Sequence, residues 1–148
     1  MPIRLADAGA TEEIGRALAA RLRVGDAVAL RGALGTGKTT LARGVLRGLG
    51  HEGDVASPTF PIVQVYEPPG IRIPLWHVDL YRIERAGELD ELGLDEGRAQ
   101  GAMLIEWPER LTALWPETLI LDLDAAEGGG RALTARVPPA WGGRWPPT

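Results

Sequence analysis

The sequence contains no cysteine, a single lysine and no long apolar run. Without cysteine, the chain has no disulfide framework, no thiolate metal site and no cysteine nucleophile. A membrane helix needs about 20 apolar residues, and the first ten residues lack the basic start and apolar core of a signal peptide. We therefore expect a cytoplasmic protein with no membrane association. The net charge of −4 argues against broad non-specific binding to nucleic acid.

The length and composition are those of one globular domain. The chain has 148 residues, of which 45% are hydrophobic and 24% are charged. A domain of this size hides about 70% of its unfolded surface, so it can build a real core. We predict a single domain over residues 1–137. From Pro138 to residue 148 the chain is rich in Pro, Gly and Trp and shows no periodicity, which predicts an irregular, loose tail.

The one lysine, against fifteen arginines, lies in a phosphate-binding motif. Residues 32–39 read Gly-Ala-Leu-Gly-Thr-Gly-Lys-Thr and match G-x-x-x-x-G-K-[ST] at every fixed position. Glycines in such a loop let backbone N–H groups of residues 35–39 point at phosphate oxygens. Lys38 would bridge the β- and γ-phosphates, and the Thr39 hydroxyl would bind magnesium. The sequence therefore predicts a nucleoside triphosphate site.

Hydrophobic patterning places this motif between a strand and a helix. Apolar runs and alternation predict strands, and 3.6-residue periodicity predicts helices. The expected strands are residues 27–30, 62–66, 73–81, 102–106, 118–123 and 131–137, of which 62–66 with 73–81 and 118–123 with 131–137 form antiparallel pairs. The expected helices begin near Thr11, cover residues 39–49, 84–92 and 95–100, and start again at Pro108. The sum is an α/β fold, a P-loop NTPase-like sheet with a parallel centre, antiparallel additional strands and helices on both faces.

Two carboxylates at strand ends are candidates for a second magnesium anchor. Asp79 closes one apolar strand and Glu106 closes another. Magnesium prefers oxygen ligands and keeps several waters, so one direct and one water-mediated carboxylate suits it. Asp79 could instead be an outward residue on an alternating strand. Glu106 follows three apolar residues, and burying an acid there is costly unless it is paired or binds a cation.

Three further sites carry alternative interpretations. The hydroxyls of Ser57-Pro58-Thr59 could sense the γ-phosphate, but such a triplet is also an ordinary entry to a strand. His77 could act as a base, although its place in a strand favours a solvated or hydrogen-bonded histidine. Trp107 could stack on a base or a partner, or pack in the core.

Taken together, these segments resemble the TsaE (YjeE) family, the bacterial ATPases of tRNA threonylcarbamoyladenosine biosynthesis. The resemblance covers about residues 10–123. Its more specific elements are Ser57-Pro58-Thr59-Phe60, His77-Val78-Asp79-Leu80-Tyr81-Arg82 and Ile105-Glu106-Trp107-Pro108-Glu109, in the order of the family and alongside the phosphate-binding motif.

The resemblance implies a function beyond the spacing of the motifs. Members of this family bind a TsaB–TsaD heterodimer, which transfers a threonylcarbamoyl group to an adenosine at position 37 of tRNA. Their ATP cycle supports repeated turnover of that complex, and a direct contact with tRNA is left open. By this resemblance Lys38, Asp79 and Thr59 serve catalysis, Asp79 as a Walker-B-type acid, while Thr39 and Glu106 hold Mg2+. The residues expected to bind ATP are Gly35, Thr36, Gly37, Lys38, Thr39 and Thr40.

Two other functions fit a phosphate-binding loop. A small-molecule kinase would need an acceptor pocket and usually a lid, and this chain has no obvious arginine-bearing insertion to form one. A docking module would bind ATP without hydrolysing it.

The expected reaction, ATP hydrolysis, is in-line attack of water on the γ-phosphorus. Because the motifs identify no arginine finger, we expect slow hydrolysis alone and faster hydrolysis with the partner complex.

Overall fold

The computed structural model describes residues 2–33, 36–55, 63–81, 83, 88, 91–111 and 114–147. In this part of the chain the strands are β1 (Ile3–Leu5), β2 (Ala27–Arg31), β3 (Val63–Tyr66), β4 (Leu75–Asp79), β5 (Ala102–Glu106), β6 (Leu119–Ala125) and β7 (Arg131–Arg136). The α-helices are α1 (Ala8–Ala19), α2 (Lys38–Leu49) and α4 (Leu94–Gln100), and Pro108–Arg110 and Pro139–Trp141 form 3-10 turns. None of the described helices has the length and apolarity to cross a bilayer.

The strands form one mixed sheet with the order β1-β7-β6-β2-β5-β4-β3. The four central strands, β6, β2, β5 and β4, run parallel. β3 pairs antiparallel with β4 at one edge, and β7 and β1 add antiparallel strands at the other. The predicted α/β fold, with its parallel centre and antiparallel additions, is confirmed.

The parallel centre is buried on both faces, which explains its unbroken apolar sequence. Every residue of β5 is buried, and the first four residues of β2 are as well. Parallel strands sit between helical layers, so they lack the polar face of an edge strand. Alternate residues of β5 consequently face two different core clusters, one containing Ala102 and Leu104 and the other Met103 and Ile105.

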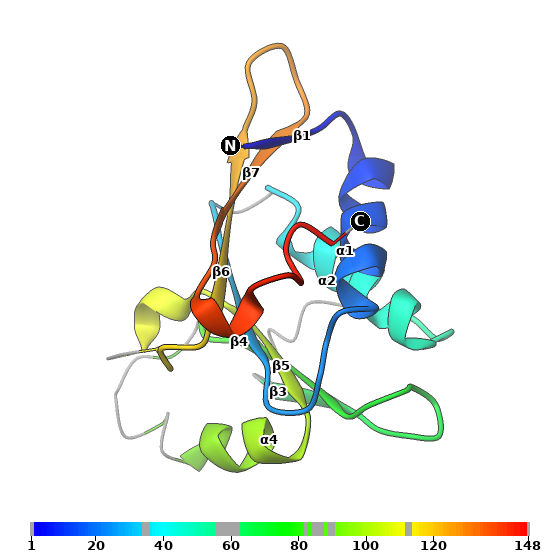
Figure 1. Ribbon diagram of the computed structural model, residues 1–148, viewed down its shortest axis with the longest axis vertical. Coiled ribbons are helices and arrows are strands. Elements are labelled where there is room, and N and C mark those ends of the chain that lie inside the picture. The colour runs from blue at the N-terminus through cyan, green and yellow to red at the C-terminus, as the bar shows by residue number, and fades with distance from the viewer. Residues whose placement is uncertain are drawn as a thin grey trace.

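Helices α1 and α2 cover one face of the sheet and lie side by side (Figure 1). Their packing is close because three helical glycines stand at the contact. A Cβ at Gly44 would lie 2.1 Å from the carbonyl oxygen of Glu12, and one at Gly15 would lie 2.4 Å from that of Leu41. Gly48 is restricted in the same way by Ala19. The opposite face carries α4, whose Leu94 joins the cluster of Met103 and Ile105.

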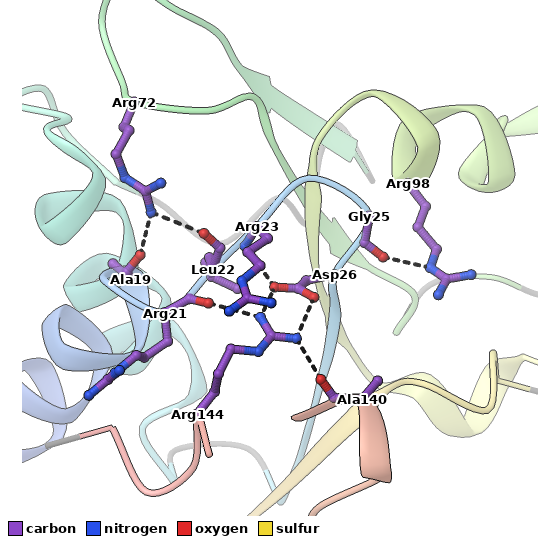
Figure 2. A network of polar contacts seen from close by, with 10 residues as sticks. All are labelled: Ala19, Arg21, Leu22, Arg23, Gly25, Asp26, Arg72, Arg98, Ala140 and Arg144. Carbon is purple, nitrogen blue, oxygen red and sulfur yellow. Dashed lines mark hydrogen bonds and ion pairs between the residues drawn. The ribbon is translucent and has the colours of Figure 1, made fainter. Parts of the chain in front are cut away.

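The residues from Pro138 pack against the domain, so the expectation of a loose tail is wrong. Trp141 is fully buried in the main core cluster. Arg144 donates from both terminal nitrogens to the carboxylate of Asp26, at 2.7 and 3.1 Å, and to the carbonyl oxygens of Arg21 and Ala140 (Figure 2). The buried Trp141 ring and the Arg144–Asp26 ion pair thus hold the C-terminal segment in place, although its sequence has no hydrophobic periodicity. The boundary of the domain at residue 137 stays a prediction.

Candidate functional site

The phosphate-binding motif occupies the turn between β2 and α2, with glycine at positions that no other residue fits easily. Gly32 has φ 149°, and a Cβ there would lie 2.5 Å from the carbonyl oxygen of Leu123. Gly37 caps α2 with φ 103°. Both conformations lie in a region that side chains disfavour. Gly35 lies outside the described residues. The loop geometry therefore depends on glycine, as the motif predicts.

The first turn of α2 begins at an N-cap residue that has no side chain to bond its backbone N–H groups. Gly37 supplies no side-chain hydrogen bond, and the first bond of the helix runs from the N–H of Leu41 to the carbonyl of Gly37. The N–H groups of Lys38, Thr39 and Thr40 precede that bond. Uncapped N–H groups and the positive end of the helix dipole favour an anion at such a place.

Lys38 is held inside the site rather than extended into solvent. The residue is 5% exposed, and Nζ donates to the carbonyl oxygen of Gly32 at 2.6 Å. The ammonium also lies 3.7 Å from the centre of the Trp107 ring. Burial lowers the pKa of Lys38, while the negative charges of Glu106, Asp79 and Glu109 act in the opposite direction. A desolvated ammonium of this kind gains strongly from a phosphate oxygen.

The two candidate carboxylates stand side by side at the ends of neighbouring parallel strands. Asp79 and Glu106 are paired in the register of β4 and β5, so their side chains leave the same face of the sheet. They are 5% and 2% exposed. Oδ1 of Asp79 accepts the backbone N–H of Tyr81 at 2.9 Å. Asp79 is therefore not an outward residue, because a strand inside a parallel sheet has no solvent face.

His77 bonds one of these carboxylates. It is fully buried, and its Nε2 lies 2.6 Å from Oε2 of Glu106. The expectation of a hydrogen-bonded histidine is confirmed, and the solvated alternative is wrong. Sequence reasoning missed the partner, although His77 stands two residues before Asp79 and so shares its face of β4.

Trp107 packs at the edge of the core, one of the two roles considered for it, while stacking on a base or a partner stays a prediction. It is half-buried beside the cluster of Met103 and Ile105, and its backbone has φ 60°, which is unusual for a residue other than glycine. The ring lies 4.9 Å from that of Tyr81, between centres, and receives Lys38 on its face. Trp107 thus borders both the core and the site.

A cavity of about 310 Å³ opens beside the loop. Its walls come from the start of α1, the loop with the first turn of α2, and the start of β7. The lining residues are Ala6, Asp7, Ala8, Thr11, Thr36, Gly37, Thr40, Gly130 and Arg131. Arg131 also fastens the loop, since its Nε donates to the carbonyl oxygen of Thr36 at 3.1 Å. Sequence reasoning did not find Arg131, which lies far from the motif along the chain.

The structure brings most of the predicted site residues to one end of the parallel strands. Thr36, Gly37, Lys38, Thr39 and Thr40 form the loop and first helical turn, with Asp79 and Glu106 at the neighbouring strand ends. Thr59, like Gly35, lies outside the described residues. The described part of the chain holds no group of three or more His, Cys, Asp or Glu side chains able to bind a metal. A hydroxyl and carboxylates, all hard oxygen donors, still fit Mg2+ in its usual manner, with water completing its shell.

Comparison with known proteins identifies the family. The model of the family "Threonylcarbamoyl adenosine biosynthesis protein TsaE" matches residues 5–133. This chain belongs to the TsaE family. A TsaE protein of Streptomyces coelicolor is 45% identical over 118 residues, covering 78% of this chain and 80% of its own. The TsaE protein of Bacillus subtilis is 42% identical over 108 residues, covering 72% and 66%.

The fold agrees with that assignment. The crystal structure of Bacillus subtilis YdiB superimposes with a TM-score of 0.77 and 32% sequence identity, covering 91% of this chain and 83% of YdiB. The role of this TsaE-family chain therefore lies in tRNA threonylcarbamoyladenosine biosynthesis.

Proposed function

We propose that this TsaE-family chain binds ATP with Mg2+ and hydrolyses it, and that this cycle supports repeated turnover of a TsaB–TsaD complex that modifies position 37 of tRNA. The observation that carries the proposal is the buried ammonium of Lys38 at an uncapped helix N-terminus, within electrostatic reach of Glu106 and Asp79. A cation, the backbone N–H groups of a helix N-terminus and oxygen ligands at one point suit a polyphosphate and its metal.

Each part of the site has a place in this reaction. The backbone amides and Lys38 hold the β- and γ-phosphates, and the cavity of about 310 Å³ takes the nucleoside. Thr39 and Glu106 would hold Mg2+, which when bound neutralises charge on the phosphate oxygens. Asp79 lies beside Glu106 and would orient water at the metal or at the γ-phosphate. Thr59 is proposed to contribute to the switch loop, by resemblance to the family.

The first test measures phosphate release. We expect Lys38→Ala to abolish hydrolysis, because it removes the charged donor to the transferred phosphoryl group. Arg16→Ala is a matched control, since this arginine is exposed on α1 and, among the described residues, forms ion pairs with Glu12 and Glu13 of its own helix. Near-normal turnover by Lys38→Ala would refute the assignment of the site. Transfer of the γ-phosphate to a metabolite would instead identify a kinase.

The second test measures the partner effect. An arginine finger supplied by a partner increases phosphoryl-transfer rates by about 10³ to 10⁵, so we expect TsaB–TsaD to accelerate hydrolysis. Equal rates with and without the heterodimer would contradict this. Reconstituted tRNA modification should exceed one product per complex only when this chain is present with hydrolysable ATP. Tight ATP binding and assembly without phosphate release would indicate a docking module.

A further inference from the structure

His77, which is bonded to Glu106, has no part in the function described so far. Both side chains are buried, at 0% and 2% exposure of the residue, and the pair lies between the neighbouring strands β4 and β5. Nε2 of His77 and Oε2 of Glu106 lie 2.6 Å apart, which is short for an N–H···O hydrogen bond. With Glu106 ionised, the Nε2–H of His77 is the donor and Oε2 of Glu106 is the acceptor.

The second nitrogen of the histidine ring is unsatisfied. Its Nδ1 is buried without a hydrogen-bond partner among the described residues. An apolar side chain would fill the same space in a parallel strand without an unsatisfied nitrogen, and burying a polar group unpaired is costly. The single polar interaction that histidine adds at this position is therefore the bond to Glu106.

We propose that His77 is a positioning residue that fixes the carboxylate of Glu106 for Mg2+. Its bond engages Oε2, so that Oε1 is the oxygen left for the metal or for a water on it. This inference rests on the proposed function, in which Glu106 is a magnesium ligand. It adds a residue to the site that acts through Glu106 and does not touch the nucleotide.

The expected size of the effect follows from the demands of magnesium. This ion requires near-octahedral geometry at short distances, so a carboxylate free to rotate binds it less well. Loss of a hydrogen-bonding partner behind a metal ligand typically costs 10- to 100-fold in metal affinity. Binding of metal-free ATP depends on the loop and Lys38, and removal of the bond from His77 should leave it nearly unchanged.

The test compares His77→Leu with His77→Gln. Leucine fills the space without a donor, whereas the Nε2 amide of glutamine extends about as far as the Nε2 of histidine and can donate to Glu106. Calorimetric titration of ATP in EDTA and at several Mg2+ concentrations gives both nucleotide and metal affinities. We expect His77→Leu to weaken magnesium affinity by about 10- to 100-fold, with ATP affinity in EDTA unchanged and with His77→Gln restoring most of the loss.

Several outcomes would overturn the inference. An unchanged magnesium affinity in His77→Leu, or an equal loss with and without Mg2+, would show that His77 only packs. If His77→Leu does not fold, His77→Asn replaces it, since its shorter amide cannot reach Glu106. Equal magnesium affinities in His77→Asn and His77→Gln would then contradict the proposal.

The variant Glu106→Ala distinguishes a failure of the proposed role of His77 from a failure of the proposed metal site. If Glu106→Ala loses magnesium-dependent binding while His77→Leu does not, only the role of His77 is refuted. If the unmodified protein binds ATP with no effect of Mg2+, or Glu106→Ala retains the full effect, the proposed metal site itself is refuted.

Discussion

Lys38 lies ready for the phosphate that the proposed function assigns to this loop. Its ammonium has left water for the carbonyl oxygen of Gly32 and the face of Trp107, and burial lowers its pKa. Neither contact compensates fully for lost hydration, because a carbonyl and a ring are weaker partners than an anion. A phosphate entering the loop would therefore attract Lys38 away from both.

This exchange gives an optical prediction. The movement of a cation off the Trp107 ring changes the electric field on the indole, so nucleotide binding should alter tryptophan emission. We expect the change to disappear in Trp107→Phe, which keeps an aromatic ring for packing but removes this fluorophore from the five tryptophans of the chain. Fluorescence titration with ATP checks this. An equal change in Trp107→Phe would assign the signal to another tryptophan.

The sequence pointed to candidate residues but not to their contacts. The motif predicts a role for Lys38 and a lone acid after three apolar residues predicts one for Glu106; the structure buries both, and their roles stay predictions. The sequence could not show that Glu106 is paired with His77, because that contact depends on the register between β4 and β5, which are not neighbours along the chain. The burial of Asp79 follows from the same cause, since only the strand order reveals that β4 lies inside the sheet.

At the scale of elements, the contact between α1 and α2 positions the first turn of α2. Gly44 allows that contact, because a Cβ there would meet the Glu12 backbone at 2.1 Å. Alanine is favoured over glycine by about 1 kcal/mol in an isolated helix, but the helices would have to separate. We expect Gly44→Ala to lower the free energy of unfolding by about 1–3 kcal/mol, as measured by urea denaturation.

Gly9 provides the control for this prediction. It lies in the first turn of α1, and an added Cβ would meet only the Asp7 side chain, at 3.3 Å. Gly9→Ala should therefore be close to neutral. If Gly44→Ala were as stable as Gly9→Ala, the close contact between α1 and α2 would not require the absence of a Cβ at position 44.

Arg131 links the start of β7 to the phosphate loop through the carbonyl of Thr36 and also lines the cavity. We expect Arg131→Leu to weaken ATP binding by about tenfold, the equivalent of one hydrogen bond to a charged group. The loss should be equal in EDTA and in Mg2+, since the bond of Arg131 to the carbonyl oxygen of Thr36 supports the loop and not the proposed metal ligands. A loss confined to Mg2+ in calorimetric titration would contradict this role.

Element prediction succeeded where the signal was local. The strand at 27–30, the helix at 39–49 and both antiparallel pairs were found within a few residues of β2, α2, β3–β4 and β6–β7. The strand β1 was missed because three residues at an edge carry no periodicity, and its pairing with β7 spans nearly the whole chain. Most of the helix predicted over 84–92, and all of Ser57-Pro58-Thr59, lie outside the described residues.

At the scale of the molecule, the proposed nucleotide site and the C-terminal segment lie at opposite ends of β2. The phosphate loop follows the carboxyl end of β2, whereas Asp26, which precedes this strand, receives the C-terminal segment (Figure 2). The family model ends at residue 133, before this segment begins. Sequence reasoning failed for the segment because Trp141 and Arg144 are held by contacts distant in the chain, which composition alone does not reveal.

This separation predicts a stability effect without a binding effect. Arg144→Leu leaves the Asp26 carboxylate without its arginine, and the two side chains are only 8% and 11% exposed. Breaking such a buried pair costs about 3–5 kcal/mol, and each 1 kcal/mol is about 2–4 °C in Tm for a domain of this size. ATP affinity below the unfolding transition should be unchanged, because the loop lies at the other end of β2.

Arg136→Leu is the control for this prediction. The Arg136 side chain is 65% exposed and lies 4.0 Å from Asp122, and such surface pairs contribute about 0–1 kcal/mol. Equal Tm values for Arg144→Leu and Arg136→Leu would show that the C-terminal segment does not depend on Arg144. A loss of ATP affinity in folded Arg144→Leu would contradict the second part of the prediction, because it would show that the two ends of β2 are coupled.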